Sequence, residues 1–335
     1  MRRGPLYYLS GLFLAGIVLG ACFANRIAPY DPNREDRQNS FHPPTRIHFW
    51  DENGRFHARP FVRRMEVTYD RNLKRCYEEV PGEKYFLRRG RTALLSVQLP
   101  ARIYLFGADS RGRDLFSRVL YGARTSLSLG LFGALVATAV GFLLGAVAGY
   151  CGGWRDTLLM RFSEFFIMIP AFYLLLALRS VLPPTLGPSQ VYGLVILILS
   201  LVGWGGVARV VRGMVLSLRE REFVLAARML GRGTWEILGQ HILPHTLSYL
   251  AVILSVSIPA YILGESFLSV LGLGIQEPAI SWGNLLAEAL SVARVQLHPW
   301  VLFPGLFIFL VALACNVLGD HFRDRTAYRS IGITP

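Results

Sequence analysis

The sequence predicts an all-α polytopic membrane protein with six transmembrane helices and a small, partly β insertion outside the membrane after the first helix. Three observations lead to this class. Hydrophobic residues make up 53% of the 335 residues and charged residues only 17%, whereas an average soluble domain is about a quarter charged. Six runs are long and apolar enough to cross a bilayer as helices. Arginine is concentrated in alternate loops between these runs, which is the positive-inside pattern of multi-pass proteins.

The six predicted spans follow the apolar runs in chain order. Each run holds roughly 20 mostly apolar residues, the length that a helix needs to cross the hydrocarbon core. Glycines recur at small-residue spacing in the second run, for example Gly141, Gly145 and Gly149, and such spacing lets helices pack closely. The spans are expected at about residues 6–24, 127–150, 165–182, 191–211, 248–271 and 300–318.

The charge of the loops sets the expected orientation. The net charge of +13 would suit nucleic acid or an anionic membrane surface, but basic cytoplasmic loops explain it in a multi-pass protein. Both termini and the loops after the second and fourth runs are rich in arginine, whereas the loop "PPTLGPSQ" after the third run has no charge. We therefore expect both termini in the cytoplasm and the long segment after the first span on the outer side.

The outer segment, at about residues 26–106, has local structure of its own. "RIHFWDENGRFHARPF" alternates around Asn53 and Gly54, which is a strong hairpin signal. "EKYFLRRG" is expected to form another short strand. We predict a small, partly β insertion at about residues 42–106, and the sequence assigns no role to it.

The cysteines and histidines predict no metal site. The sequence has no Cys-x-x-Cys or HExxH motif, which are common zinc-binding patterns. His241 and His245 are four residues apart, but Pro244 between them is expected to break the helix that would present both as ligands. "LGAC", which ends at Cys22, loosely fits a lipoprotein cleavage box. The alternative, which five further spans favour, is a signal-anchor helix that contains a cysteine.

The segment "EREFVLAARMLGRGTWEILGQHILPH", from Glu220 to His245, places a charged helix–break–helix unit between the fourth and fifth spans. It could be a connecting loop, a DNA-binding helix-turn-helix or a docking element. A helix-turn-helix needs clearance to enter a DNA groove, and the candidate pair, "AARMLGRGTWEIL", ends about eight residues before the next span. A docking element fits better, because paired alanines allow a partner to approach closely. In addition, Gly231 and Gly233 permit turns that a Cβ resists, and Pro244 is expected to stop the second helix.

The same segment resembles the EAA motif of ABC importer permeases, through "EFVLAARMLG" and the "HILP" that follows. In that family the motif forms a coupling helix that docks into a groove of the ATP-binding subunit. The resemblance therefore implies an ATPase-coupling role for the matching residues. These are Glu222, Ala226, Ala227, Gly231, Ile242, Leu243 and Pro244.

The resemblance covers most of the chain outside about residues 38–105. "FGADSRGRDLFSRVLYGARTSLSLG" resembles the signature of dipeptide, oligopeptide and nickel permeases. Its matching residues are Gly112, Arg113, Asp114 and Arg124. They could be functional, or could belong to a solvated charge cluster that caps the second span. "ILGESFLSVLGLGIQEPAISWGNLL" resembles the family's stretch around the fifth span and includes Glu265. Ala108 and Glu164 depart from the signatures, where Thr and Asp are usual.

The resemblance implies the ABC type-1 importer permease fold, a place in the cell inner (plasma) membrane and a division of the chain into five parts. Residues 1–25 would be the N-terminal transmembrane helix, residues 26–106 the extracytoplasmic segment and residues 107–126 the pre-span signature segment. Residues 127–320 would form the ABC transmembrane type-1 domain, with a cytoplasmic EAA coupling loop at 219–245. A cytoplasmic tail would follow at residues 321–335.

The sequence offers no motif for ATP hydrolysis. A P-loop needs Gly-Lys-[Ser/Thr] to hold the phosphates, and neither Lys74 nor Lys84, the two lysines, follows a glycine. We therefore expect a transport subunit and not an enzyme, with no cofactor of its own and with ATP and Mg²⁺ on a partner. The expected partners are a second permease subunit, ABC ATPase subunits, an extracytoplasmic substrate-binding protein and membrane lipid, but no nucleic acid.

The expected function is to form half of a translocation path for peptides or similar small solutes; a nickel chelate is one such solute. The alternatives are a secondary transporter driven by an ion gradient and, below it, the DNA-binding regulator. Ion-driven carriers usually hold functional ionisable residues deep in their spans. Glu265 is the candidate, as a gate or pathway residue or as a packing residue satisfied by a neighbouring helix. Glu222 is expected to pair with the ATPase, or with Arg219 or Arg228, and Gly231 to lie at the tightest contact.

Overall fold

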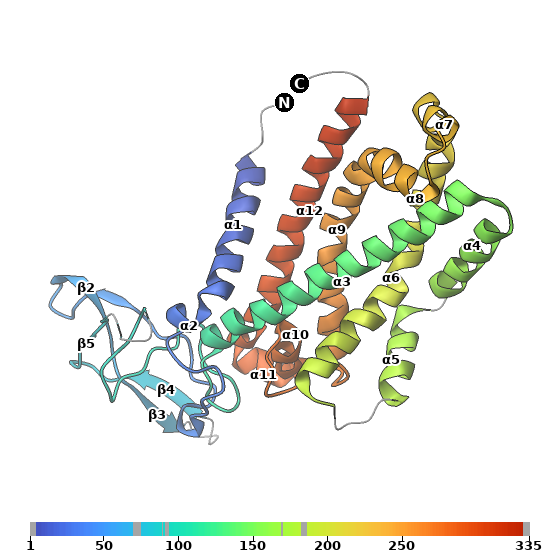
Figure 1. The fold of residues 1–335 in the computed structure, drawn as a ribbon. Helices are drawn as coiled ribbons and strands as arrows, with labels where there is room; N and C mark the ends of the chain where they lie inside the picture. The colour runs from blue at the N-terminus through green and yellow to red at the C-terminus, as the bar shows by residue number, and fades with distance from the viewer. Residues whose placement is uncertain are drawn as a thin grey trace. The chain divides into compact units, whose positions relative to one another are not determined.

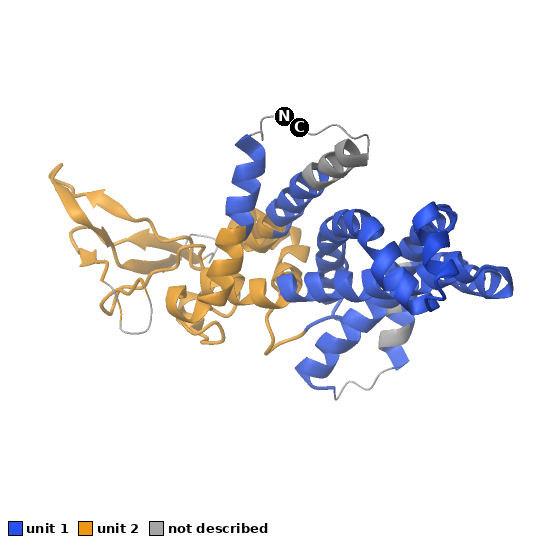
Figure 2. Ribbon diagram, turned by 45° about the horizontal axis from the view of Figure 1, so that its top comes forward, with its two compact units in different colours: residues 1–14, 126–275, 308–335 blue, residues 15–125, 276–307 orange. Residues whose placement is uncertain are grey.

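A computed structural model describes residues 5–69, 75–88, 90, 94–168, 170–181 and 186–330 of the chain. The chain is divided into two compact units, which Figure 2 shows in different colours. Unit 1 comprises residues 1–14, 126–275 and 308–335, and unit 2 comprises residues 15–125 and 276–307. Unit 1 contains most of the long helices, and unit 2 contains the β-strands.

The chain is mostly helical, as the sequence predicts (Figure 1). The apolar runs form helices because a helix satisfies each backbone polar group within its own segment, as a bilayer requires. The helices are α1 (Pro5–Cys22), α2 (Ala24–Ile27), α3 (Leu115–Cys151), α4 (Gly153–Met168), α5 (Ala171–Val181), α6 (Pro188–Leu218), α7 (Glu222–Met229), α8 (Thr234–Ile237), α9 (Leu243–Val270), α10 (Trp282–Leu286), α11 (Val292–Leu297) and α12 (Phe303–Ser330). Short 3₁₀ turns cover Arg37–Asn39, Ala287–Leu290 and Pro299–Leu302, and a π turn covers Leu238–Ile242.

Five helical stretches among the described residues are long and apolar enough to cross a membrane. They are Pro5–Cys22, Leu115–Cys151, Pro188–Leu218, Thr234–Val270 and Pro299–Asp320. These stretches confirm the multi-pass helical class and correspond to five of the six predicted runs. The third predicted run, at about residues 165–182, falls on the end of α4 and on α5. Ile169 and Leu182 of that run lie outside the described residues.

The glycines of α3 allow the close helix packing that the sequence predicts in unit 1. A Cβ on Gly145 would lie 2.4 Å from the carbonyl oxygen of Ala208 in α6. A Cβ on Gly130 would lie 2.6 Å from the side chain of Ile262 in α9. Any larger residue at either position would push the helices apart. Small residues at such contacts are the usual means by which helices associate in lipid.

Unit 2 contains the β insertion between α2 and α3. The predicted hairpin around Asn53 and Gly54 is confirmed, and Gly54 has a φ of 72° that suits its turn. The strand expected in "EKYFLRRG" is also present as a two-residue strand, whereas the hairpin of β3 and β4 was not expected. One antiparallel sheet has the strand order β1 (His48–Trp50), β2 (Phe56–Val62), β5 (Tyr85–Phe86). The other pairs β3 (Met65–Tyr69) with β4 (Arg75–Glu79).

Candidate functional site

The charged unit between α6 and α9 lies in unit 1, and we name its residues, 219–245, the coupling segment. Helices α7 and α8 are separated by a turn in which Gly231 has a φ of 76°. The backbone N–H of Arg232 donates to the carbonyl oxygen of Ala227 at 3.2 Å across this turn. Glycine adopts such a conformation without a steric penalty. The φ angle therefore favours glycine at this turn. A Cβ on Gly231 would meet no atom within 4 Å, so no tight contact within this chain calls for glycine.

One face of the coupling segment is anchored to the long helices. Val224 and Ala227 of α7 and Ile237 of α8 are at most 4% exposed and belong to one apolar core. The other members of this core come from α3, α6, α9 and the π turn at Leu238–Ile242. They are Ala146, Val207, Val211, Val215, Leu238, Ile242 and Leu250, with Leu243 packed against them. Helix α7 is thus packed against the same apolar core as the long helices, and close-packed interiors transmit strain.

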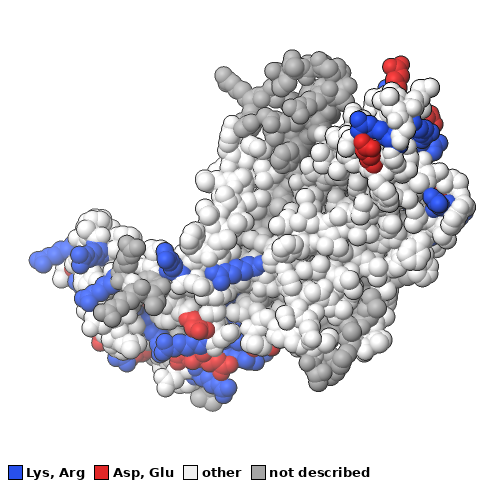
Figure 3. Space-filling model, in the orientation of Figure 1, with Lys and Arg blue, Asp and Glu red and all other residues white. Residues whose placement is uncertain are grey.

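The opposite face of the coupling segment is apolar and exposed. Met229 is 90% exposed, Leu230 79% and Trp235 69%, and Glu222 and Ala226 are exposed on the same unit. Figure 3 shows basic and acidic side chains around the part of the surface that α7 and its turn form. Exposed apolar patches rimmed by polar residues occur at sites that bind another protein, a membrane or a ligand.

The structure corrects two expectations about the coupling segment. The two alanines do not both face outward, because Ala227 is 4% exposed and lies in the apolar core while Ala226 is exposed. Pro244 does not stop the second helix, because α8 continues through the π turn at Leu238–Ile242 into α9. Pro244 lies in the first turn of α9, where the π turn has already changed the hydrogen-bond pattern and the missing N–H is tolerated.

The arginines near Glu222 have other partners. Arg219 lies 3.7 Å from Glu220, and the guanidinium of Arg228 lies over the ring of Tyr150 at 5.2 Å. No ion pair joins Glu222 to another residue that the structure describes. Glu222 therefore pairs with neither arginine in this chain, and the carboxylate of Glu222 is exposed.

His241 and His245 lie on the continuous helix, and the ring of His245 makes contacts within the chain. The Nδ1 atom of His245 lies 2.7 Å from the carbonyl oxygen of His241. The ring of Phe223 stacks on His245 with 4.7 Å between centroids, which ties α7 to the start of α9. Among the described residues, no group of three His, Cys, Asp or Glu side chains could hold a metal ion.

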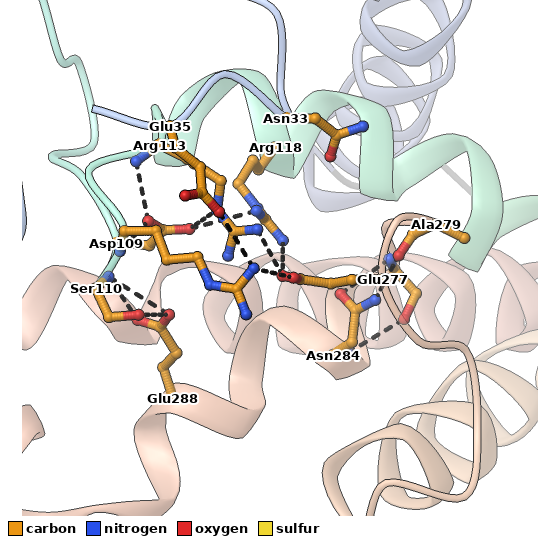
Figure 4. Close-up of polar contacts among 12 residues, drawn as sticks. Asn33, Glu35, Asp109, Ser110, Arg113, Arg118, Glu277, Ala279, Asn284 and Glu288 are labelled. Carbon is orange, nitrogen blue, oxygen red and sulfur yellow. Dashed lines mark hydrogen bonds and ion pairs between the residues drawn. The ribbon is translucent and has the colours of Figure 1, made fainter. Parts of the chain in front are cut away.

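Unit 2 gathers part of the pre-span signature into a buried charge cluster, which Figure 4 draws. Arg113 binds Asp109 at 2.6 Å and Glu277 at 2.7 Å. Arg118 reaches the same two acids at 3.4 Å and 3.0 Å, and Arg111 binds Glu277 at 2.8 Å. Asp109, Arg113 and Arg118 are at most 5% exposed. The interpretation of these residues as a solvated cluster is therefore wrong.

The charge cluster joins two segments that are far apart in the sequence, residues 109–118 and residues 277–288. Burial would raise the pKa of Glu277, but the guanidinium groups of Arg113 and Arg118 hold it below its ordinary value. Glu277 is therefore ionised at neutral pH and pairs with both arginines. Beside it, the hydroxyl of Ser110 donates to the carboxylate of Glu288 at 2.5 Å, which adds a second tie.

Asp114 caps the N-terminus of α3 from within unit 2. Its carboxylate accepts hydrogen bonds from the backbone N–H of Ser117 at 2.9 Å and from the Ser117 hydroxyl at 2.5 Å. Such a cap satisfies a backbone donor that the first helical turn leaves free. Burial raises the pKa of Asp114 to about 6, because the charged form loses its hydration.

Gly112 and Arg124 complete the signature, and both hold the backbone in place. Gly112 has a φ of 74°, and a Cβ there would lie 1.8 Å from the carbonyl oxygen of Asp36. Arg124 donates to the carbonyl oxygens of Ala21 and Cys22 at 2.5 Å and 3.0 Å. It thereby satisfies acceptors that the last turn of α1 leaves open.

Glu265 is fully buried in unit 1. Its carboxylate accepts hydrogen bonds from the Ser269 hydroxyl at 2.6 Å and from the Ser126 hydroxyl of α3 at 3.5 Å. The Ser269 oxygen in turn accepts from the backbone N–H of Ile275 at 3.0 Å. This chain of bonds joins α9 to α3 and to the turn that follows α9. The geometry favours the packing role over the gate.

Asp109, Glu277 and Ser269 were not singled out from the sequence. In the sequence each is an ordinary polar residue, and the two acids gain their importance from arginines that folding brings beside them. The available signal was position, because all three lie inside stretches that resemble the permease signatures.

Sequence comparisons with known proteins agree with the resemblance to permeases. The sequence model of the family described as "Binding-protein-dependent transport system inner membrane component" matches residues 141–328. The chain is 41% identical over 226 residues to the dipeptide transport system permease protein DppC of Bacillus subtilis (strain 168), covering 67% of this chain and 68% of that protein. It is 40% identical over 222 residues to the oligopeptide transport system permease protein OppC of Haemophilus influenzae, covering 66% and 69%. A solved structure of inward-facing conformations of the MetNI methionine ABC transporter gives a TM-score of 0.47 at 15% identity, covering 62% of this chain and 97% of that chain.

Proposed function

Since the chain belongs to the family of binding-protein-dependent transport system inner membrane components and is a permease subunit of an ABC importer, we propose that it forms half of a translocation path for peptides. The names of the relatives, which are dipeptide and oligopeptide permeases, support peptides as the substrate class. A second permease subunit supplies the other half of the path. Membership of this family replaces the two alternatives, an ion-gradient carrier and a DNA-binding regulator.

The coupling proposal rests on one observation, the two unlike faces of the coupling segment. Met229, Leu230 and Trp235 are exposed on one face, while Val224 and Ala227 on the other are packed against α3, α6 and α9. The exposed face suits a groove of an ATPase subunit. A shift of that subunit would then reach the long helices as a rigid-body motion and switch the path between its two accesses.

Each matching residue of the EAA resemblance receives a role in this proposal. Glu222 pairs with a basic group of the ATPase, and Ala226 lets the two surfaces approach closely. Gly231 allows the turn that presents the exposed face. Ala227, Ile242, Leu243 and Pro244 keep the segment attached to the long helices.

The orientation of the chain in the membrane follows from the side on which the partner ATPase lies. We place the coupling segment, both termini and the tail at residues 321–335 in the cytoplasm, where ATP and Mg²⁺ bind the partner ATPase. The segment at residues 26–106 then lies outside the inner membrane, on the side of the substrate-binding protein. The arginine-rich loops agree with this orientation.

The test compares two exposed tryptophans. Trp235→Ala removes an anchor of the exposed face, and Trp154→Ala removes a tryptophan that is 72% exposed outside the coupling segment. An interface anchor of this kind is worth about 2 kcal/mol or more, so Trp235→Ala should weaken ATPase binding by roughly 30-fold. Uptake of labelled dipeptides and longer peptides should fall with it, and Trp154→Ala should leave both near normal. Equal effects of the two substitutions would contradict the assignment of this face.

A further inference from the structure

The free end of the β1–β2 hairpin in unit 2 exposes three aromatic side chains. Phe49 is 44% exposed, Trp50 61% and Phe56 59%. The rings of Trp50 and Phe56 lie 5.2 Å apart between centroids, and those of Phe49 and Phe56 lie 6.4 Å apart. They therefore form one cluster. Exposed aromatic clusters are unusual on a surface that faces only water.

Three arginines that lie in or next to the β1–β2 hairpin have no acidic partner among the residues that the structure describes. Arg46, Arg55 and Arg59 are exposed, and no ion pair joins any of them to another described residue. We call these three arginines, with Phe49, Trp50 and Phe56, the hairpin patch.

The acids at the same end of the hairpin are already neutralised within the insertion. Asp51 lies 2.8 Å from the Lys84 ammonium, and its side chain is 3% exposed. Glu52 lies 3.3 Å from the guanidinium of Arg63. The hairpin patch therefore presents free positive charge together with aromatic surface, and it fits an anionic partner with an apolar layer.

The hairpin patch belongs to the same compact unit as the last turns of α1, residues 15–22. The insertion is also tied to the exit of this helix, because the Leu94 N–H donates to the carbonyl oxygen of Arg26 in α2 at 2.8 Å. Leu94 and Phe23 are 54% and 53% exposed beside that exit. Unit 2 thus carries further apolar side chains where a membrane-spanning helix ends.

We propose that the hairpin patch binds the surface of a phospholipid bilayer with anionic headgroups. Trp50, Phe49 and Phe56 lie at the headgroup level, where aromatic rings are favoured because they are amphipathic. Arg46, Arg55 and Arg59 bind lipid phosphates, and their attraction grows with the negative charge of the surface. A protein partner would have to supply acids opposite all three arginines. The bilayer supplies phosphate at the level where α1 ends.

The test uses the emission of Trp50 in the full permease. The full chain is inserted in lipid nanodiscs made of phosphatidylcholine, with or without phosphatidylglycerol, and with bromine on the upper acyl chain. The contribution of Trp50 is the difference between the wild-type protein and Trp50→Phe. Bromolipid should quench this contribution, and more strongly in the anionic discs. Iodide in the solvent should quench it less in anionic discs than in detergent.

The charged half of the proposal has its own variant. Replacing Arg46, Arg55 and Arg59 together by Gln should remove the difference between the anionic and the neutral discs. Arg64→Gln is the matched control, because Arg64 is already paired with Glu66 at 3.1 Å. Unchanged thermal unfolding of both variants shows that the insertion still folds. The proposal is overturned if bromolipid leaves Trp50 unquenched, if neutral and anionic discs quench it equally, or if Trp50 is protected only after a substrate-binding protein is added.

Discussion

Gly231→Asp is expected to separate the permease from its ATPase while leaving the permease folded. A Cβ at this position would meet no atom within 4 Å, so the penalty within the chain comes from the φ of 76°. This conformation costs an ordinary residue about 1–2 kcal/mol, and Asn and Asp adopt it more readily. Where the ATPase covers the position, a carboxylate buried without a partner costs roughly 3–5 kcal/mol. The affinity for the ATPase should therefore fall by about 100-fold or more.

The assay titrates the ATPase subunit onto the permease in nanodiscs and follows ATP hydrolysis and peptide uptake in parallel. Gly231→Asn is the matched control, since it has nearly the same shape and the same backbone preference but no charge. It should unfold at the same temperature as Gly231→Asp and keep more of the ATPase affinity. The reasoning is refuted if Gly231→Asp binds the ATPase as the wild-type protein does and still imports peptides.

Three further substitutions test the buried polar groups. Arg118→Met leaves the Asp109 carboxylate buried with one arginine fewer, so the free energy of unfolding should fall by roughly 3 kcal/mol. The control is Arg111→Met, whose side chain is 51% exposed and whose loss should cost no more than about 1 kcal/mol. Thermal unfolding measures both variants, and equal losses would contradict a buried cluster. Asp114 has a folded pKa of about 6 against an ordinary 3.8, so protonation favours the folded state, and this contribution is full below pH 3.8 and lost as the pH rises through 6. The stability of the wild-type protein relative to Asp114→Asn should therefore rise by roughly 2 kcal/mol as the pH is lowered from about 7 to 4, and a pH-independent difference would contradict the shift. Glu265→Gln keeps an oxygen that can accept from Ser269, so peptide uptake should stay within about twofold of normal, whereas loss of uptake with normal ATP hydrolysis would restore Glu265 as a gate.

The sequence alone predicted the membrane class, the places of five of the spans though not the full length of their helices, the first hairpin and the break at Gly231. These features depend on neighbouring residues, because apolar runs, a turn dipeptide and a glycine act over short distances. The resemblance to permeases also led to the family that the comparisons bear out. The third span and the coupling roles of individual residues stay predictions.

Only the tertiary structure decided which side of each element is covered. Ala226 and Ala227 are identical neighbours in the sequence, yet one is exposed and the other lies against residues from α3, α6 and α9. From the sequence, Pro244 is expected to end a helix, whereas in the structure the π turn before it continues into α9. Asp109 and Glu277 acquire their role only when folding places them against the same two arginines. The physical reason is that burial and charge pairing depend on residues distant in the chain, and local sequence patterns contain no information about such neighbours.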